Sequence, residues 1–153
     1  MENKFKKSEM WMTLFFFLTM LSLFLLMGAK KPQIIEKTKA PYLLSGEMKK
    51  NVKGLENAFE YEMKNLSDKT ICEYQLILSL FDYDGEPALQ GDYITLDVKE
   101  KIQARNYSKN EIDLSPYLFE NPEDAYLTDY FYASRVVFDD GTVFEDPFGR
   151  LQG

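Results

Sequence analysis

Residues 10–29 form an apolar run, MWMTLFFFLTMLSLFLLMGA, that contains no charged residue. An α-helix of this length spans about 30 Å, which is the thickness of the hydrocarbon core of a bilayer. Large side chains such as Phe16, Leu23 and Phe24 cover every face of such a helix, and a soluble domain of about 120 residues could not bury them all. The run therefore predicts one transmembrane helix, and the membrane is the first expected partner of the chain.

The length and the end of the run favour a retained signal anchor over a cleaved signal peptide. The apolar part of a cleaved peptide is about 7 to 15 residues long, and the residues at the first and third positions before the cut are small. A cut after Ala29 would place Met27 at the third position. We expect residues 10–29 to stay as a transmembrane signal anchor, with cleavage and secretion as the alternative.

The charges beside the run bear on its orientation. Lys4, Lys6 and Lys7 lie on the nine-residue tail, and positive residues favour the cytoplasmic side of a membrane. Lys30 and Lys31 put comparable charge on the opposite flank, but so short a tail before a first helix is typical of a signal anchor. We expect a cytoplasmic tail at residues 1–9 and an extracytoplasmic C-terminal domain on a single-pass cell-membrane protein.

The composition of the chain excludes several kinds of chemistry. The net charge is −7, and residues 1–31 hold five Lys against two Glu, so the remainder carries −10 and repels nucleic acid. The absence of His removes the usual general base and the commonest metal ligand. Cys72 is the single cysteine, which excludes an intramolecular disulfide and a multi-thiolate zinc site. We expect a non-enzymatic protein without cofactor or metal.

Alternation of apolar and polar residues predicts strands in the exported part. Residues 30–54 mix Lys with Pro and Gly without a sustained period, so we expect a linker there. Residues 106–129 are expected to be mostly loop, with room for a short strand or a helical turn. Strands are predicted at residues 56–64, 70–81, 93–105, 129–139 and 142–146, the last two joined by an Asp140-Gly141 hairpin turn. Short connections between them predict an all-β fold, a small antiparallel sandwich over residues 55–153.

Two segments carry a family resemblance. Residues 65–71, NLSDKTI, precede Leu78-Ser79-Leu80-Phe81-Asp82 and Gly85, and together they resemble the FxLYD-type domains, which are small immunoglobulin-like sandwiches on bacterial extracytoplasmic proteins. Leu78 stands where that pattern has Phe, and Phe81 where it has Tyr. Residues 136–144, VVFDDGTVF, look like the final hairpin of uncharacterised secreted bacterial domains. The resemblance implies an immunoglobulin-like fold outside the cytoplasm, and it brings no catalytic residues.

Aromatic residues gather near the start of the predicted strand at residues 129–139. The candidate ligand-binding residues are Tyr126, Tyr130 and Tyr132, with Phe131 between the last two. Tyrosine rings can stack on sugar rings or grip a peptide. Because alternate residues of a strand face the core, packing is the other interpretation of this cluster.

Two acidic clusters resemble cation sites. Asp82-x-Asp84-Gly85 begins like a calcium loop, but Pro87 falls where the loop needs Gly, so a plain turn is expected. Weak cation binding and a role in keeping a sheet edge soluble are both open for the second cluster, which consists of Asp139, Asp140, Glu145 and Asp146.

The expected function follows from the anchor, the strands and the missing catalytic side chains. We expect a membrane-anchored module of the bacterial envelope that binds another envelope protein or a wall glycan, or that serves a structural purpose. The alternative is a secreted module, released by cleavage, that binds a glycan or a peptide through its tyrosines.

Overall fold

The computed structural model of the protein describes residues 39–151. The predicted tail at residues 1–9 and the predicted anchor at residues 10–29 lie outside this range, and residues 39–151 contain no helix that could span a membrane. The described chain forms the strands β1 (Tyr42–Val52), β2 (Leu55–Asn65), β3 (Ile71–Phe81), β4 (Ile94–Val98), β5 (Tyr107–Asp113), β6 (Leu127–Phe138) and β7 (Val143–Glu145).

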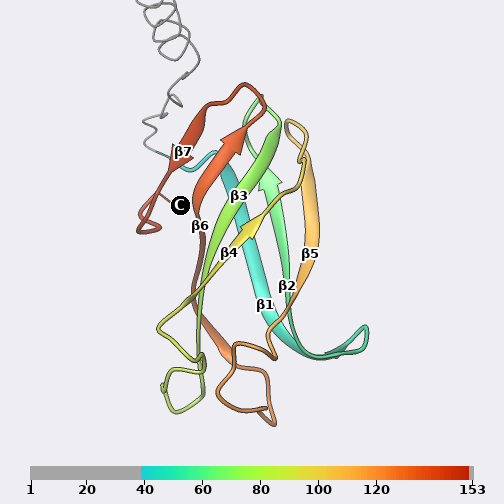
Figure 1. The fold of residues 1–153 in the computed structure, drawn as a ribbon, viewed down its shortest axis with the longest axis vertical. Helices are drawn as coiled ribbons and strands as arrows, with labels where there is room; N and C mark the ends of the chain where they lie inside the picture. The colour runs from blue at the N-terminus through green and yellow to red at the C-terminus, as the bar shows by residue number, and fades with distance from the viewer. Residues whose placement is uncertain (1–38, 152–153) are drawn as a thin grey trace, which may run out of the picture. The chain divides into compact units, whose positions relative to one another are not determined.

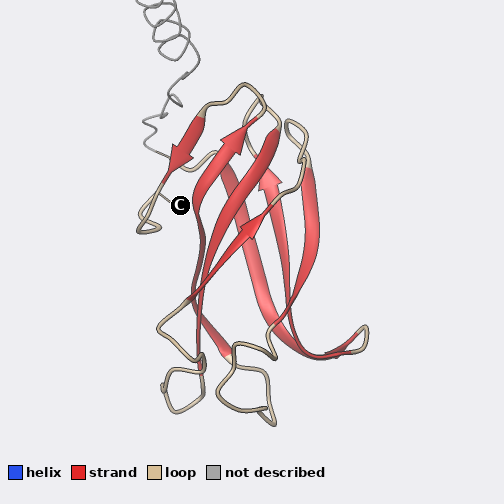
Figure 2. Ribbon diagram, viewed as in Figure 1, coloured by secondary structure: helices blue, strands red, loops and turns tan. Residues whose placement is uncertain are grey.

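The strands form two sheets that pack face to face (Figure 1). One sheet has the order β1-β2-β5 and the other has the order β4-β3-β6-β7. Every strand pair is antiparallel, and turns and loops make up the rest of residues 39–151 (Figure 2). The prediction of an all-β fold with antiparallel sheets is confirmed for the described residues.

The predicted linker at residues 30–54 is wrong from residue 42 onward. β1 pairs with β2 from Tyr42, opposite Asn65, to Val52, opposite Leu55. Inward-facing residues do alternate along β1, but Gly46 occupies one of the inward positions and hides the period. The β-domain therefore includes β1 and does not begin at residue 55.

β4 is shorter than the strand predicted at residues 93–105. It ends at Val98, and after it only Ile102 returns to the sheet, in an isolated bridge with Ile71 of β3. The apolar face of the predicted strand is broken at Glu100. The carboxylate of this residue turns toward hydrogen-bond donors on β3 and β5, so the chain leaves the sheet there.

β5 lies in the region for which the sequence predicts mostly loop. Its residues alternate between exposed and half-buried, with Ser108, Asn110 and Ile112 on the half-buried side. Two of these three residues are polar, and both donate hydrogen bonds to Glu100. An apolar period therefore cannot reveal this strand.

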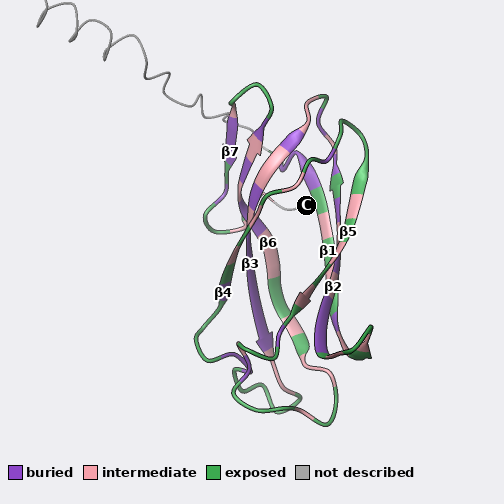
Figure 3. Ribbon diagram, turned by 45° about the vertical axis from the view of Figure 1, so that its right-hand side comes forward, coloured by how far each residue is buried: buried purple, intermediate pink, exposed green. Residues whose placement is uncertain are grey.

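The core lies between the two sheets, and β3 is buried along most of its length (Figure 3). Removal of apolar side chains from water is the main driving force for this packing. The largest fully buried side chains include Phe59, Met63, Tyr74, Leu76, Leu78 and Phe144. Ile77, on the opposite side of β3, is only 7% exposed, so the outer face of this sheet is also partly covered.

Tyr42 connects the two sheets. Its buried hydroxyl donates to the carbonyl oxygen of Ala133 at 2.9 Å and accepts from the N–H of the same residue at 3.0 Å. Its ring meets Phe144 edge-on, with ring centroids 6.1 Å apart. The start of β1 is thereby fixed to β6 and β7 of the opposite sheet.

The turn between β2 and β3 is organised by the buried side chain of Asn65. The amide nitrogen donates to the carbonyl oxygens of Lys69, Ile102 and Gln103. The amide oxygen accepts from the backbone N–H and the hydroxyl of Ser67. The Asn-x-Ser sequence therefore has a structural role in this turn.

The predicted Asp140-Gly141 hairpin is confirmed. Gly141 has a φ of 79°, a conformation that costs glycine little. Val137 pairs with Val143, and the N–H of Phe138 donates to the carbonyl oxygen of Thr142 at 3.0 Å.

Candidate functional site

Tyr130 and Tyr132 lie side by side on the outer face of the sheet β4-β3-β6-β7. Phe131 between them points inward, where its ring packs edge-on against Phe59 and Tyr61 at centroid distances of 4.8 and 5.7 Å. The rings of Tyr130 and Tyr132 are 6.0 Å apart and tilted by 43°. Two of the three candidate ligand-binding residues thus share one surface.

Tyr126 does not join this pair. It is half-buried against the core, and its backbone N–H lies 3.3 Å from the sulfur of Met48. Burial, followed by the nearby carboxylates of Glu120 and Asp82, raises the pKa of Tyr126. The candidate site predicted from the sequence is therefore reduced to Tyr130 and Tyr132.

The structure adds Tyr93, which the sequence analysis missed. Tyr93 precedes β4, on the other side of β3 from β6, and it is 53% exposed. Burial, followed by the nearby Tyr130, Asp146 and Tyr93, raises the pKa of Tyr132. Tyr93 stands alone in the sequence, so only the order of the strands brings it near the pair. We call the three residues Tyr93, Tyr130 and Tyr132 the tyrosine face.

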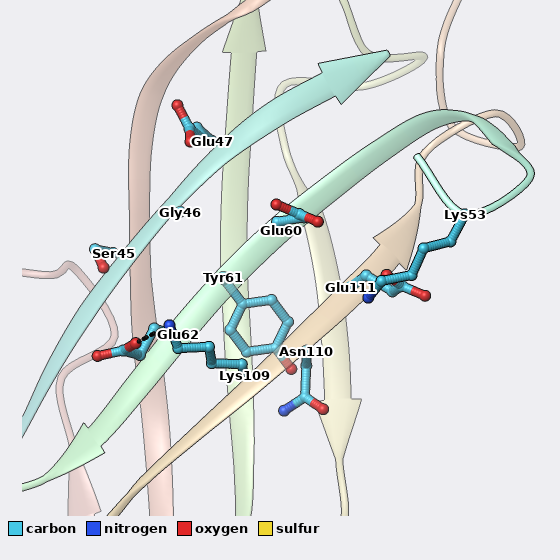
Figure 4. Close-up of a pocket in the computed structure, with 10 residues that line it drawn as sticks. All are labelled: Ser45, Gly46, Glu47, Lys53, Glu60, Tyr61, Glu62, Lys109, Asn110 and Glu111. Atoms are coloured by element: carbon cyan, nitrogen blue, oxygen red, sulfur yellow. Dashed lines mark hydrogen bonds and ion pairs between the residues drawn. The ribbon is translucent and has the colours of Figure 1, made fainter. Parts of the chain in front are cut away.

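The opposite sheet carries a second candidate surface. A hollow with a volume of about 660 Å³ lies over β1, β2 and β5 (Figure 4). Glu47, Glu60 and Glu111 lie directly opposite one another on the three strands, in the register of the sheet. Like charges placed in this way repel one another, so the row needs cations nearby.

Lysines of the same chain supply those cations. Lys49 lies 3.2 Å from Glu47 and 2.9 Å from Glu60, and Lys53 lies 2.6 Å from Glu111. The hydrogen bond from Lys49 holds the pKa of Glu60 below its ordinary value. Each carboxylate of this row is therefore paired with a lysine of the same domain.

A polar network runs beneath the hollow. The hydroxyl of Tyr74 donates to the carboxylate of Glu100 at 2.9 Å. Because that hydrogen is already used, Tyr61 donates in the 3.1 Å hydrogen bond between the hydroxyls of Tyr61 and Tyr74. Asn110 donates to the same carboxylate at 2.8 Å. Burial, followed by the contact with Tyr61, raises the pKa of Tyr74 far above its ordinary value. Tyr74 is thus a neutral structural donor at neutral pH.

The acidic residues of the C-terminal hairpin serve structural contacts. Asp140 accepts from Lys69 at 2.6 Å and from Thr142, and these bonds hold the pKa of its carboxyl well below the ordinary value. Asp146 is buried and accepts from two backbone N–H groups of the following turn. Within residues 39–151, no group of three or more His, Cys, Asp or Glu is arranged to hold a metal ion. The residues Asp139, Asp140, Glu145 and Asp146 therefore form no such group.

The acidic residues after β3 form a turn. One carboxylate oxygen of Asp82 accepts from the backbone N–H groups of Asp84 and Glu86, each at 2.9 Å. An Asp side chain that bonds to its own following backbone is a common turn-former. This arrangement agrees with the plain turn expected from the sequence.

A comparison of the sequence with known protein families and with curated proteins finds no match.

Proposed function

We propose that this protein is a membrane-anchored, extracytoplasmic module of the bacterial envelope that works by binding rather than by catalysis. Residues 10–29 are the anchor in this proposal, and an envelope protein or a wall glycan is the partner. Support comes from the uncharged twenty-residue run and from a composition without His and with a single Cys.

We further propose that the domain is an immunoglobulin-like sandwich of the FxLYD type. The strand order supports this assignment, because β1, β2 and β5 take the places of strands A, B and E, and β3, β6 and β7 those of C, F and G. β4 lies beside the C position, as an added edge strand does in variable-type domains. The Asn65–Ile71 turn opens β3, which ends in the Leu-Ser-Leu-Phe motif.

The observation that carries the binding proposal is the tyrosine face. Three tyrosines stand on the outside of a sheet whose core is already filled from its other side. Tyr93 and Tyr130 are exposed, whereas Tyr132 is half-buried and its hydroxyl donates to the carbonyl oxygen of Pro147. Tyrosine presents a large, rigid ring with a polar tip, which suits contact with a protein or a sugar. The carboxylates of the hollow over the other sheet are already paired with lysines of the same domain, which makes the hollow the weaker candidate.

Photo-crosslinking in cells tests the proposed binding surface. A photoreactive phenylalanine analogue replaces Tyr130 in the full chain, and the same analogue replaces Glu62, on the outer face of the other sheet, as a matched control. The expected result is a discrete crosslinked envelope product from position 130 and none from position 62. No product from position 130, or the same products from both positions, would count against the tyrosine face.

The secreted alternative is a glycan-binding module that uses the adjacent rings of Tyr130 and Tyr132, whose centroids lie 6.0 Å apart. Retention of the protein on isolated wall glycan tests it. A Tyr130→Ala variant should lose that retention, and a wild-type protein that is not retained would eliminate this alternative.

A further inference from the structure

A pocket with a volume of about 480 Å³ opens beside Tyr130, at one end of the tyrosine face. Its volume falls within the range of small-ligand sites. Residues that line it are Leu80, Phe81, Pro87, Asp92, Asp129 and Tyr130. The pocket therefore combines an apolar wall, two aromatic residues (Phe81 and Tyr130) and two acidic residues.

A β-bulge brings Asp129 to this pocket. β6 pairs with β3 through Tyr130, opposite Ser79, and through Thr128, opposite Leu80, so Asp129 is an extra residue between them. Bulges of this kind re-aim a side chain at the edge of a sheet. A regular strand would instead have placed successive residues on opposite faces.

The carboxylates around the pocket have no cation of their own. Residues 82–93 and 113–129 contain nine Asp and Glu and no Lys or Arg. Their summed charge of −9 is nearly the whole net charge of −10 that residues 32–153 carry. None of the nine takes part in an ion pair within residues 39–151. Lys50 touches the second segment, but through the side chain of Asn121 and the backbone of Pro122. We call residues 82–93 and 113–129 the acidic segments.

The two acidic segments form one connected surface. The N–H of Gln90 donates to Tyr117 at 2.9 Å, and the N–H of Phe119 donates to Ala88 at 3.2 Å. Both segments lie at the end of the sandwich opposite the start of β1 (Figure 1). They expose two further aromatic rings, because Phe119 is 66% and Tyr83 is 70% exposed.

We propose that the pocket beside Tyr130 takes a lysine or arginine side chain from a basic segment of a partner protein. The aliphatic part of that side chain packs on the apolar wall, and its cation lies over the tyrosine ring between Asp92 and Asp129. The unpaired charge of the acidic segments attracts the rest of the basic segment. This inference rests on the binding function proposed above and names the chemistry of the partner.

The charge of the surface favours a basic protein segment over the other possible partners. A second copy of the chain that docks through the same surface brings the same acidic segments and is repelled, and so is a phosphate-bearing lipid or wall polymer. The hydroxyl groups of a neutral glycan donate hydrogen bonds to carboxylates such as those of Asp92 and Asp129, but they leave the negative charge uncompensated. A basic protein segment is the occupant that uses both the rings and the charges.

The test measures peptide binding to the full chain held in nanodiscs of neutral phosphatidylcholine. The probe is a short fluorescent peptide of alternating lysine and serine, and fluorescence anisotropy gives its dissociation constant at low and at physiological salt. Asp92→Asn combined with Asp129→Asn should weaken binding about tenfold at low salt, since two charge contacts are lost. Both residues are exposed, so the variant should unfold at the wild-type temperature.

The matched control removes two carboxylates elsewhere. Glu47→Gln combined with Glu62→Gln changes the net charge equally, on the face where the carboxylates are paired with lysines. Binding should stay within about twofold of wild type. Equal loss in both double variants would reduce the effect to net charge and overturn the proposal, as would a wild type that does not bind the lysine peptide. Crosslinking from position 130 is independent of this peptide, so a failed titration with a retained crosslink would refute the basic partner and leave the binding function intact.

Discussion

Gly46 shows how one residue shapes the packing between the sheets. A Cβ atom built on Gly46 would lie 2.5 Å from Cε1 of Phe59, far inside van der Waals contact. The ring of Phe59 is fully buried and is held at 4.8 Å from Phe131, so it has little room to move away. The absence of a side chain at Gly46 therefore lets the two rings pack under β1.

A Gly46→Ala substitution should destabilise the domain by about 1 to 3 kcal/mol, which is the usual cost of overpacking a core. Equilibrium unfolding in denaturant measures the change in the free energy of unfolding. Gly91→Ala is the matched control, because its Cβ would meet its nearest neighbour at 3.8 Å, an ordinary contact. A Gly46→Ala variant as stable as the control would show that Phe59 can shift at little cost.

The sequence could predict some residues of the candidate site and not others. Alternation along residues 129–139 places Tyr130 and Tyr132 on one face, and the structure agrees. Tyr126 could not be excluded in this way, because it lies before the strand and its burial depends on Met48 of a strand that was not predicted. Tyr93 could not be included, because its nearness to Tyr132 depends on which strands flank β3.

At the scale of elements, strands with a regular apolar period were predictable and strands with polar or absent inward side chains were not. β2 and β3 lie within a residue of their predicted ends, and the last hairpin has its predicted turn. β1 was missed because Gly46 interrupts its inward row, and β5 was hidden because Ser108 and Asn110 face inward. The start of β4 lies within a residue of its predicted position, but its end was predicted too late, because the polar contacts of Glu100 outweigh the alternation around it.

β1 leads to a prediction about the limits of the domain. A chain that begins at residue 55 loses the whole β1–β2 ladder and the hydrogen bonds between Tyr42 and Ala133. It also exposes one side of Phe59 and Met63, which are fully buried in the complete domain. Each such side chain contributes about 1.5 to 3 kcal/mol when buried, and a domain of this size is stable by about 5 to 15 kcal/mol.

The chain beginning at residue 55 should therefore be unfolded, whereas a chain beginning at residue 39 should fold. Dispersion of backbone amide signals in a proton–nitrogen NMR spectrum distinguishes the two states. A folded, dispersed spectrum from the shorter chain would mean that the domain boundary predicted from the sequence is adequate after all.

At the scale of the whole molecule, charge is distributed unevenly along the chain. Residues 1–31 carry +3, and the acidic segments carry nearly all of the opposing charge of the remainder. Positive residues beside an apolar run favour a membrane with an anionic inner surface, whereas an acidic, aromatic surface favours a basic protein partner. This division of charge is consistent with the proposed function, in which one part of the chain anchors and the other binds.

The most direct test of the proposed function is fractionation of cells that express the full chain, with the mass of the product determined and protease added outside spheroplasts. The account predicts an uncleaved product in the membrane fraction whose β-domain is digested by the external protease. A soluble product shortened near Ala29 would contradict the anchor and favour the secreted module, and a membrane product protected from the protease would contradict the extracytoplasmic placement of the domain.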